Sequence, residues 1–589
     1  MKYLLDKPSN VHLIHGFDWR TTSTPTDRLH LEVSFVHAEG VLEARYDGFA
    51  KPGEILPRVT LTPVGEMPLS GTLLLHLPFA WMVEDGARFL EIDGGEWNWQ
   101  WPLLEVHCPV KSVTLLNYEA QLQPVDVLIE SYLRSEDEKC EKLPEAFLRI
   151  GDLPAESVEV RLSSNFSGGR LRYSVIAEQG ENQRFMADRS FNGNVKVQFG
   201  GESVDVALKN GVATGTIEAK GGVSAKVVYQ GHESQSNWVD PAFASELPYQ
   251  IYWGDIHVHS RESDGVGNPE EILERARDWQ RLDFMAFNEH IEHDLTWRIW
   301  TPQKWRKLKA LYDGATNDGE FVVIPGFEYR GFCNLWCFSD DYVNYLTPYF
   351  LCDEAHFHVG LIDPRWAAQE VIERAWIAHF ASQPDWMVGY HRLELLRDQQ
   401  SCIPPRVHLL QMAHYKRPPE VGSADYLMRG DRSGFFGSTD THLGMPAVGF
   451  KGGRDGQSGL TAVFAEDLSR EGLHKALLAR HCYATLGSRT LLDVRLNGAM
   501  MGDEIAVPDG APMEMNIRAA GVEKIASFEI VSGGKDIAHF DIGSSFIDKT
   551  WRSVKCGQND EYFFVRLHLE DGRMVWSSPI WAIGSAAKL

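Results

Sequence analysis

The chain has 589 residues, of which 82 are acidic and 57 basic, so its formal net charge is −25. The length predicts about three to four domains. Hydrophobic residues make up 43% and charged residues 24%, which is ordinary for a globular protein with a core large enough to need no disulfide staple. The acidic excess argues against a surface that binds nucleic-acid phosphates, because such surfaces are usually basic.

Targeting and redox signals favour a cytoplasmic protein. The first residues lack the long apolar run of a secretory signal, and Asp6 interrupts them early. No stretch approaches about 18 consecutive apolar residues, so no membrane span is expected. The eight cysteines are scattered without repeated CxxC pairs, as in a reduced compartment. Cys333 and Cys337 form a CxxxC pair, for which small apolar fillers are the favoured interpretation over metal ligands.

Residues 1–240 are predicted to form a β-sandwich region of one or two modules. Apolar residues alternate over 195–199 and 204–208, and the second run leads into Asn210-Gly211, a strong hairpin signal. Long amphipathic helical stretches are scarce here. A composition change over 135–144 is a candidate division, and the polar stretch 231–248 is a candidate linker.

Residues 250–490 alternate between strand and helix patterns. Asn268-Pro269 predicts a helix start, since Asn is a good N-cap and Pro suits the first helical position. The apolar stripe of this helix is Ile272, Leu273, Ala276 and Trp279. Strands are predicted at 284–287, 321–325, 407–412 and 435–438, and further helices at about 303–313, 364–376 and 469–481. Repeated β-α units of this size predict a parallel sheet or barrel.

Residues 491–589 return to a β pattern and are predicted to form a small C-terminal β-sandwich. Leu492, Val494 and Leu496 alternate into Asn497-Gly498, a second hairpin signal. Runs at 562–569 and 576–581 would complete the sandwich.

The central region also carries imidazoles and carboxylates at positions where strands are predicted to end. His257 and His259 are two residues apart on a strand and therefore share a face. An HxH pair is weak evidence, because 22 histidines yield about one by chance, and His356-Phe-His358 is a second pair. The context favours the first pair, since Asp255 can accept a hydrogen bond from an imidazole. Further ligand types follow in order at Asp264 in a Ser-Asp-Gly turn, then His290, Glu328, His379, Asp440 and His442.

This order of motifs resembles the PHP (polymerase and histidinol phosphatase) superfamily. The residues that carry the resemblance are DxHxH from Asp255, SDG, a strand-end His, GxE, AH and SxDxH, over about residues 250–490. Residues 459–466, residues 482–488 and the closing WSSPIW are also similar to the branch that includes carbamate-ester hydrolases.

The resemblance implies a distorted, TIM-like (β/α)7 barrel with two or three divalent metal ions in its mouth. It implies a first metal held by His257, His259, Glu328 and Asp440, a second shared through Glu328 and held by His379, and a third held by Asp264, His290 and His442. Mixed imidazole and carboxylate ligands suit Zn, Mn or Fe.

The chain departs from the family pattern at two places. Asn288-Glu289-His290 stands where Thr-Asp-His is usual. The remaining ligand of the second metal is open among Cys333, His358, His391 and His414, with His414 favoured because it follows the predicted strand 407–412.

The expected function is hydrolysis by a hydroxide shared between two metal ions. Asp264 is expected to act in catalysis, and Arg261 and Arg330 are candidates for holding an anionic group of a small-molecule substrate. A phosphoesterase is the first expectation. A carboxylic or carbamic ester hydrolase on the same centre and a non-catalytic, metal-stabilised binding protein are the alternatives. The substrate, the native metal and the oligomeric state are left open.

Overall fold

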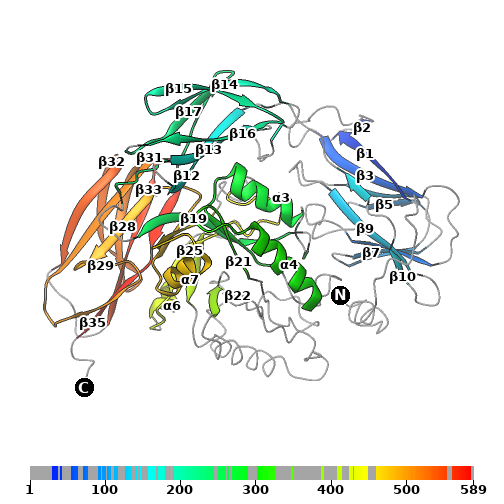
Figure 1. Cartoon of the computed structure of the whole chain (residues 1–589). Coiled ribbons are helices and arrows are strands. Elements are labelled where there is room, and N and C mark those ends of the chain that lie inside the picture. The colour runs from blue at the N-terminus through cyan, green and yellow to red at the C-terminus, as the bar shows by residue number, and fades with distance from the viewer. Residues whose placement is uncertain are drawn as a thin grey trace, which may run out of the picture.

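A computed structural model of the chain describes residues 29–37, 40–42, 55–63, 71–76, 90–93, 96–100, 103–107, 112–116, 127–134, 140–142, 146–148, 155, 157–167, 170–178, 187–188, 191–219, 221–243, 249–260, 262–263, 265, 268–289, 302–326, 328, 346–350, 386–390, 408–413, 423–428, 430–442, 444–448, 459–553 and 560–584. Over these residues the protein is multidomain and mostly β-sheet, with few helices (Figure 1). None of the helices in this part of the chain is long and apolar enough to cross a membrane.

Two antiparallel sheets form the first part of the chain. One has the order β2-β1-β3-β8-β5, with β1 at Leu29–His37, β2 at Gly40–Leu42, β3 at Ile55–Pro63, β5 at Leu90–Asp93 and β8 at Ser112–Leu116. The other has the order β10-β9-β4-β7-β6, with β4 at Thr72–His76, β6 at Trp97–Gln100, β7 at Leu103–His107, β9 at Val127–Arg134 and β10 at Cys140–Lys142, and β11 (Ala146–Leu148) also pairs with β9. Because β10 pairs with β9, residues 140–142 of the composition change lie in the same sheet as the strand that precedes them.

Two more antiparallel sheets follow, and they pack around one apolar core. The first has the order β12-β13-β16, with β12 at Ser157–Ser167, β13 at Arg170–Glu178 and β16 at Val212–Glu218. The second has the order β15-β14-β17-β18, with β14 at Gly193–Phe199, β15 at Glu202–Leu208, β17 at Ala225–Tyr229 and β18 at His232–Gln235. The strand β18 occupies the start of the predicted linker 231–248, so that part of the linker prediction is wrong.

The turn at Asn210-Gly211 forms, but its flanking strands separate. Both residues have positive φ, 51° and 76°, as a tight hairpin turn requires. Beyond the bridge between Lys209 and Val212, however, β15 and β16 belong to different sheets. The predicted hairpin is therefore a crossing between the two layers of a sandwich.

The central region contains the predicted strand and helix alternation. The helices among its described residues are α3 (Pro269–Glu274), which continues as a π-helical turn over Arg275–Trp279, α4 (Pro302–Ala315), α6 (Ser423–Met428) and α7 (Arg470–Leu478). Asn268 precedes α3 in an extended conformation, although its side chain makes no capping hydrogen bond. The predicted stripe of this helix is confirmed, since all four of its residues are buried. The helix predicted at 364–376 lies outside the described residues.

The central strands fall into two sheets that do not close into a barrel over the described residues. One contains β21 (Val322–Ile324), β20 (Phe284–Phe287), β19 (Gln250–Val258), β26 (Leu460–Ala465) and β27 (Cys482–Thr485) in that order. The other has the order β22-β23-β24-β25, with bounds Leu346–Phe350, Trp386–Tyr390, Leu409–Ala413 and Gly434–Gly437. A parallel bridge between Val258 and Thr441 connects the ends of β19 and β25.

The first of these sheets continues into the C-terminal region through the pairing of β27 with β34. Its C-terminal strands are β28 (Leu491–Leu496), β29 (Ala499–Met500), β30 (Glu504–Val507), β31 (Met513–Ser532), β32 (Lys535–Ser553), β33 (Glu561–Leu569), β34 (Met574–Ser577) and β35 (Ile580–Gly584). The hairpin at Asn497-Gly498 joins β28 and β29 as predicted. One apolar core runs through both regions, so strands on either side of the predicted boundary at residue 490 share a sheet and a core.

Arg489 connects three parts of the fold. Its guanidinium nitrogen Nη1 donates to the carbonyls of Leu162 in β12, at 3.1 Å, and Arg281, at 3.2 Å, and Nη2 donates to the carbonyl of Gln280. Burial lowers the pKa of Arg489 to about 10, so the group stays charged at neutral pH.

We predict that Arg489→Met lowers the free energy of unfolding by roughly 2–4 kcal/mol, because buried carbonyls lose their donor. Urea denaturation monitored by tryptophan fluorescence measures this. The control is Arg552→Met, whose parent side chain is 75% exposed and pairs only at the surface with Glu514. Equal stability of the two variants would contradict the role assigned to Arg489.

Candidate metal centre

The strand β19 brings two imidazoles to one buried face. It is flanked by β20 in parallel and β26 in antiparallel orientation, and every residue from Ile251 to Val258 is buried. Residues two apart on a strand share a face, and His259 follows directly after the strand. The rings of His257 and His259 are 0% exposed, so they face the protein interior.

Two carboxylates reach the same place from other strand ends. Glu328 lies beyond β21, and its backbone N–H donates to the carbonyl of Glu289 at 3.0 Å. Asp440 lies beyond β25, in a segment held to β19 because the His259 N–H donates to the Thr441 carbonyl at 3.0 Å. Asp440 has φ of 50°, a left-handed conformation that Asp tolerates better than most residues and that recurs at functional sites.

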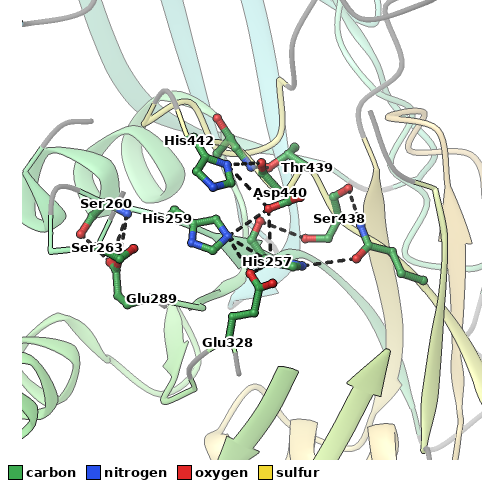
Figure 2. A network of polar contacts seen from close by, with 12 residues as sticks. His257, His259, Ser260, Ser263, Glu289, Glu328, Ser438, Thr439, Asp440 and His442 are labelled. Carbon is green, nitrogen blue, oxygen red and sulfur yellow. Dashed lines mark hydrogen bonds and ion pairs between the residues drawn. The ribbon is translucent and has the colours of Figure 1, made fainter. Parts of the chain in front are cut away.

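Four atoms of these residues converge (Figure 2). The two Nε2 atoms of His257 and His259 lie 3.1 Å apart. His257 Nε2 is 3.1 Å from Glu328 Oε2 and 3.3 Å from Asp440 Oδ1. His259 Nε2 is 3.2 Å from the same glutamate oxygen and 3.0 Å from the same aspartate oxygen. Both imidazoles therefore contact both carboxylates through the same ring nitrogen.

The separations fit a divalent ion with four ligands. A regular tetrahedron with edges of about 3.1 Å has its centre about 1.9 Å from each corner, close to the ~2.0–2.2 Å of zinc–nitrogen and zinc–oxygen bonds. The carboxylate oxygens of Glu328 and Asp440 lie within 4.8 Å of each other, and buried carboxylates this close repel unless a positive charge compensates them. The four residues therefore form a buried group that could hold a metal ion.

Protonation of an imidazole is the other way to supply positive charge here. Burial lowers the pKa of His259, but the adjoining carboxylates of Asp440 and Glu328 outweigh it and raise this pKa well above its ordinary value. The carboxylates thus attract either a proton or a cation to the same position.

His442 lies beside this group without belonging to its four-atom set. Its ring stacks on the ring of His259, with centroids 4.1 Å apart and planes at 20°. Its Nδ1 lies 3.1 Å from the backbone carbonyl of Asp440, a contact in which the ring nitrogen donates. That contact leaves Nε2 as the nitrogen with a lone pair.

Asp255 holds the segment that carries Asp440. Its carboxylate accepts hydrogen bonds from the hydroxyl of Ser438, from the backbone N–H of Thr439 at 3.1 Å and its hydroxyl at 2.6 Å, and from the N–H of Ala447 at 3.0 Å. Burial raises its pKa, although these hydrogen bonds oppose the shift. The expectation that Asp255 accepts a hydrogen bond from an imidazole is wrong, because its carboxylate is surrounded by backbone and hydroxyl donors. Asp255 instead positions the segment that follows β25.

Glu289 holds the loop that follows His259. Its carboxylate accepts from the N–H of Ser260, at 3.1 and 3.2 Å, and from the hydroxyls of Ser260 and Ser263. Figure 2 shows this group apart from the four converging side chains. Glu289 therefore anchors the backbone at Ser260 and the side chain of Ser263, just after His259.

Gln411 in β24 also reaches the centre. Its Oε1 lies 3.3 Å from Nδ1 of His257, and its Nε2 donates to the carbonyls of Ala413, at 2.9 Å, and Ser438, at 3.1 Å. Sequence inspection missed Gln411 because a buried glutamine within an apolar run carries no motif. The polar residue in the otherwise apolar run 409–413 was the available signal.

The structure brings together four of the predicted ligands and places His442 next to them. The remaining predicted site residues lie outside the described part of the chain: Arg261, Asp264, His290, Arg330, His379 and His414, together with the alternatives Cys333, His358 and His391 and the rival pair His356 and His358.

Comparisons by sequence find relatives in Chlamydia. A protein of Chlamydia muridarum is 34% identical over 376 residues, covering 57% of this chain and 58% of the relative. One of Chlamydia pneumoniae is 31% identical over 382 residues, covering 58% of each, and one of Chlamydia trachomatis is 36% identical over 139 residues, covering 21% of this chain and 22% of the relative. All three are named only as uncharacterised proteins. The chain thus spans less than two thirds of each relative's length. No protein-family model matches it.

Comparisons by structure find distant similarity to solved proteins. A two-domain protein from Bacteroides vulgatus, described as containing a predicted PHP-like metal-dependent phosphoesterase, has a TM-score of 0.32 and 14% identity, covering 56% of this chain and 96% of that protein. A Bacteroides uniformis beta-glucuronidase 2 has a TM-score of 0.18 and 8% identity, covering 95% and 80%. Scores this low assign neither fold nor function, and the resemblance to the carbamate-ester branch finds no support among these proteins.

We predict that Asp255→Asn destabilises the protein by roughly 2–4 kcal/mol, because the amide offers one acceptor where two carboxylate oxygens serve buried donors. Urea denaturation with a chelator present measures this without metal binding. Exposed Asp548→Asn is the matched control. If both variants unfold at the same urea concentration, Asp255 does not hold the Asp440 segment.

Proposed function

We propose that the protein is a PHP-type, divalent-metal-dependent hydrolase that cleaves small-molecule phosphoesters. One observation supports the proposal above all others. Each of two imidazole nitrogens lies 3.0–3.3 Å from two carboxylate oxygens that come from other strand ends, and the two nitrogens lie 3.1 Å apart. Nitrogen and oxygen ligands without cysteine are typical of hydrolytic zinc, manganese and iron sites.

Further ions belong to the proposal. Glu328 contributes Oε2 to the four-atom set, and a carboxylate has a second oxygen that can bridge to a neighbouring ion. His379 and His414 are proposed for that second ion, and Asp264, His290 and His442 for a third, all at the mouth of a distorted (β/α)7 barrel. Such ions would lower the pKa of a bound water and polarise the bond to be cleaved.

The described residues provide the frame for this chemistry. Burial of His257, His259 and Glu328 excludes bulk water and strengthens the electrostatic attraction to a cation. Asp255 and Glu289 hold the two loops that would border the substrate. Arg261 and Arg330 are proposed to bind the anionic group of the substrate, and Asp264 to take part in proton transfer.

One observation favours a second candidate, a non-catalytic protein stabilised by its metal. Four protein ligands at tetrahedral spacing can saturate an ion, as in structural zinc sites, whereas catalytic sites keep a position open. Cleavage of a carboxylic or carbamic ester at the same centre is a further variant of the hydrolase proposal.

Metal analysis combined with hydrolysis assays separates these functions. The purified protein is loaded with Zn²⁺, Mn²⁺ or Fe²⁺ and assayed with p-nitrophenyl phosphate, bis(p-nitrophenyl) phosphate and p-nitrophenyl acetate. We expect turnover of a phosphate substrate that depends on the metal. Turnover of the acetate alone would favour the ester hydrolase, and a metal-loaded protein inactive toward all three would favour the non-catalytic protein.

We predict that His257→Ala lowers bound metal and reduces turnover by more than about 100-fold, because an ion loses one of its ligands. The matched control is His481→Ala, since His481 also contacts a carboxylate, Asp503 at 2.9 Å, but lies near Tyr249 at the opposite end of β19. Unchanged metal content and turnover in His257→Ala would refute the assignment of this site.

A further inference from the structure

An irregularity at the end of β24 gives Gln411 its position. Gln411 pairs with Phe436 and Ala413 with Gly437, so the register between β24 and β25 shifts between these two pairs. Bulges of this kind re-aim a side chain and are common beside active sites. Gln411 is 3% exposed, within a run that is buried from Leu409 to Ala413.

The contacts of Gln411 fix which way its amide points. Nε2 lies within hydrogen-bonding distance of two backbone carbonyls, those of Ala413 and Ser438, which can only accept. The amide nitrogen must therefore face these carbonyls, and Oε1 must face Nδ1 of His257 at 3.3 Å. Because Oε1 can only accept, Nδ1 of His257 carries the proton.

We propose that Gln411 is a positioning residue that holds His257 in the tautomer needed to bind a metal ion. With the proton on Nδ1, the lone pair of a neutral imidazole is on Nε2, the atom next to Glu328 and Asp440. Hydrogen bonding to the second ring nitrogen commonly orients metal-binding histidines. The inference rests on the proposed function, because it assigns Gln411 a role toward the same ion.

A neutral amide suits this place better than a carboxylate. Glu328 and Asp440 already contribute two negative charges, which balance one divalent ion, so the charge of the ion requires no third carboxylate at this position. The amide also donates to two strand ends while it accepts from the ring, which an ionised carboxylate cannot do. One side chain thus connects β24, the end of β25 and the imidazole of β19.

Three variants separate the acceptor role from the donor role. Gln411→Met keeps the length of the side chain and removes both functions. Gln411→Glu keeps an acceptor for the imidazole and removes the donated hydrogen bonds. Thr461→Val is the control, because the buried Thr461 hydroxyl donates to the Gly437 carbonyl at 2.6 Å without contacting the imidazole.

The measurements are Zn²⁺ affinity of the full chain, by competition with a chromophoric chelator, and the visible absorption of the Co²⁺-loaded protein. We expect Gln411→Met to bind Zn²⁺ about 10- to 100-fold more weakly than the unmodified chain and to change the Co²⁺ spectrum. We expect Gln411→Glu and Thr461→Val to stay within about fivefold, since both leave an acceptor at Nδ1.

Two results overturn this inference alone. The first is a Zn²⁺ affinity of Gln411→Met equal to that of the unmodified chain. The second is a loss of Zn²⁺ affinity in Gln411→Glu as large as that in Gln411→Met, because the effect would then come from the lost hydrogen bonds to the strand carbonyls. An unmodified chain without measurable Zn²⁺ affinity would instead overturn the proposed function, and this inference with it. Should Gln411→Met not fold, the comparison of Gln411→Glu with Thr461→Val still decides: affinity near that of the control supports the acceptor role, and a large loss overturns it.

Discussion

The structure around the centre depends on one electrostatic constraint. Two carboxylate oxygens each lie 3.0–3.3 Å from two buried imidazole nitrogens, and all four atoms lie within 4.8 Å of one another. Like charges this close repel strongly where water cannot screen them. Such an arrangement is stable only with positive charge inside it, from a proton or a metal ion. The carboxylates of Asp440 and Glu328 raise the pKa of His259 for the same reason, because they favour a positive charge on its ring. A divalent ion meets it fully, because its charge equals that of Glu328 and Asp440 together.

Three buried residues hold segments and side chains around the centre. Asp255 fixes the segment that carries Asp440, Glu289 fixes the loop after His259, and Gln411 contacts the ring of His257. All three are buried; Asp255 and Glu289 accept hydrogen bonds from backbone N–H groups and hydroxyls, and Gln411 donates to two backbone carbonyls. The site is therefore assembled from the ends of β19, β21, β24 and β25, and the bridge between Val258 and Thr441 holds its two halves together.

Local sequence patterns predicted the elements and much of the centre. Burial of α3's stripe follows from helical periodicity, and the shared face of His257 and His259 follows from strand periodicity, because both depend only on neighbours along the chain. Pairing between distant strands does not follow from such local patterns. Asn210-Gly211 formed its turn but linked different sheets, and β27 paired with β34 across the predicted boundary at 490. The role of Gln411 could not be predicted from the sequence, because it arises from a register shift between β24 and β25.

The most direct test of the central claim is anomalous X-ray scattering at the zinc edge from crystals of the zinc-loaded protein. The account predicts an anomalous peak enclosed by Nε2 of His257, Nε2 of His259, Oε2 of Glu328 and Oδ1 of Asp440, with bonds of about 2.0–2.2 Å. Zinc bound elsewhere while these four side chains enclose no peak would contradict it.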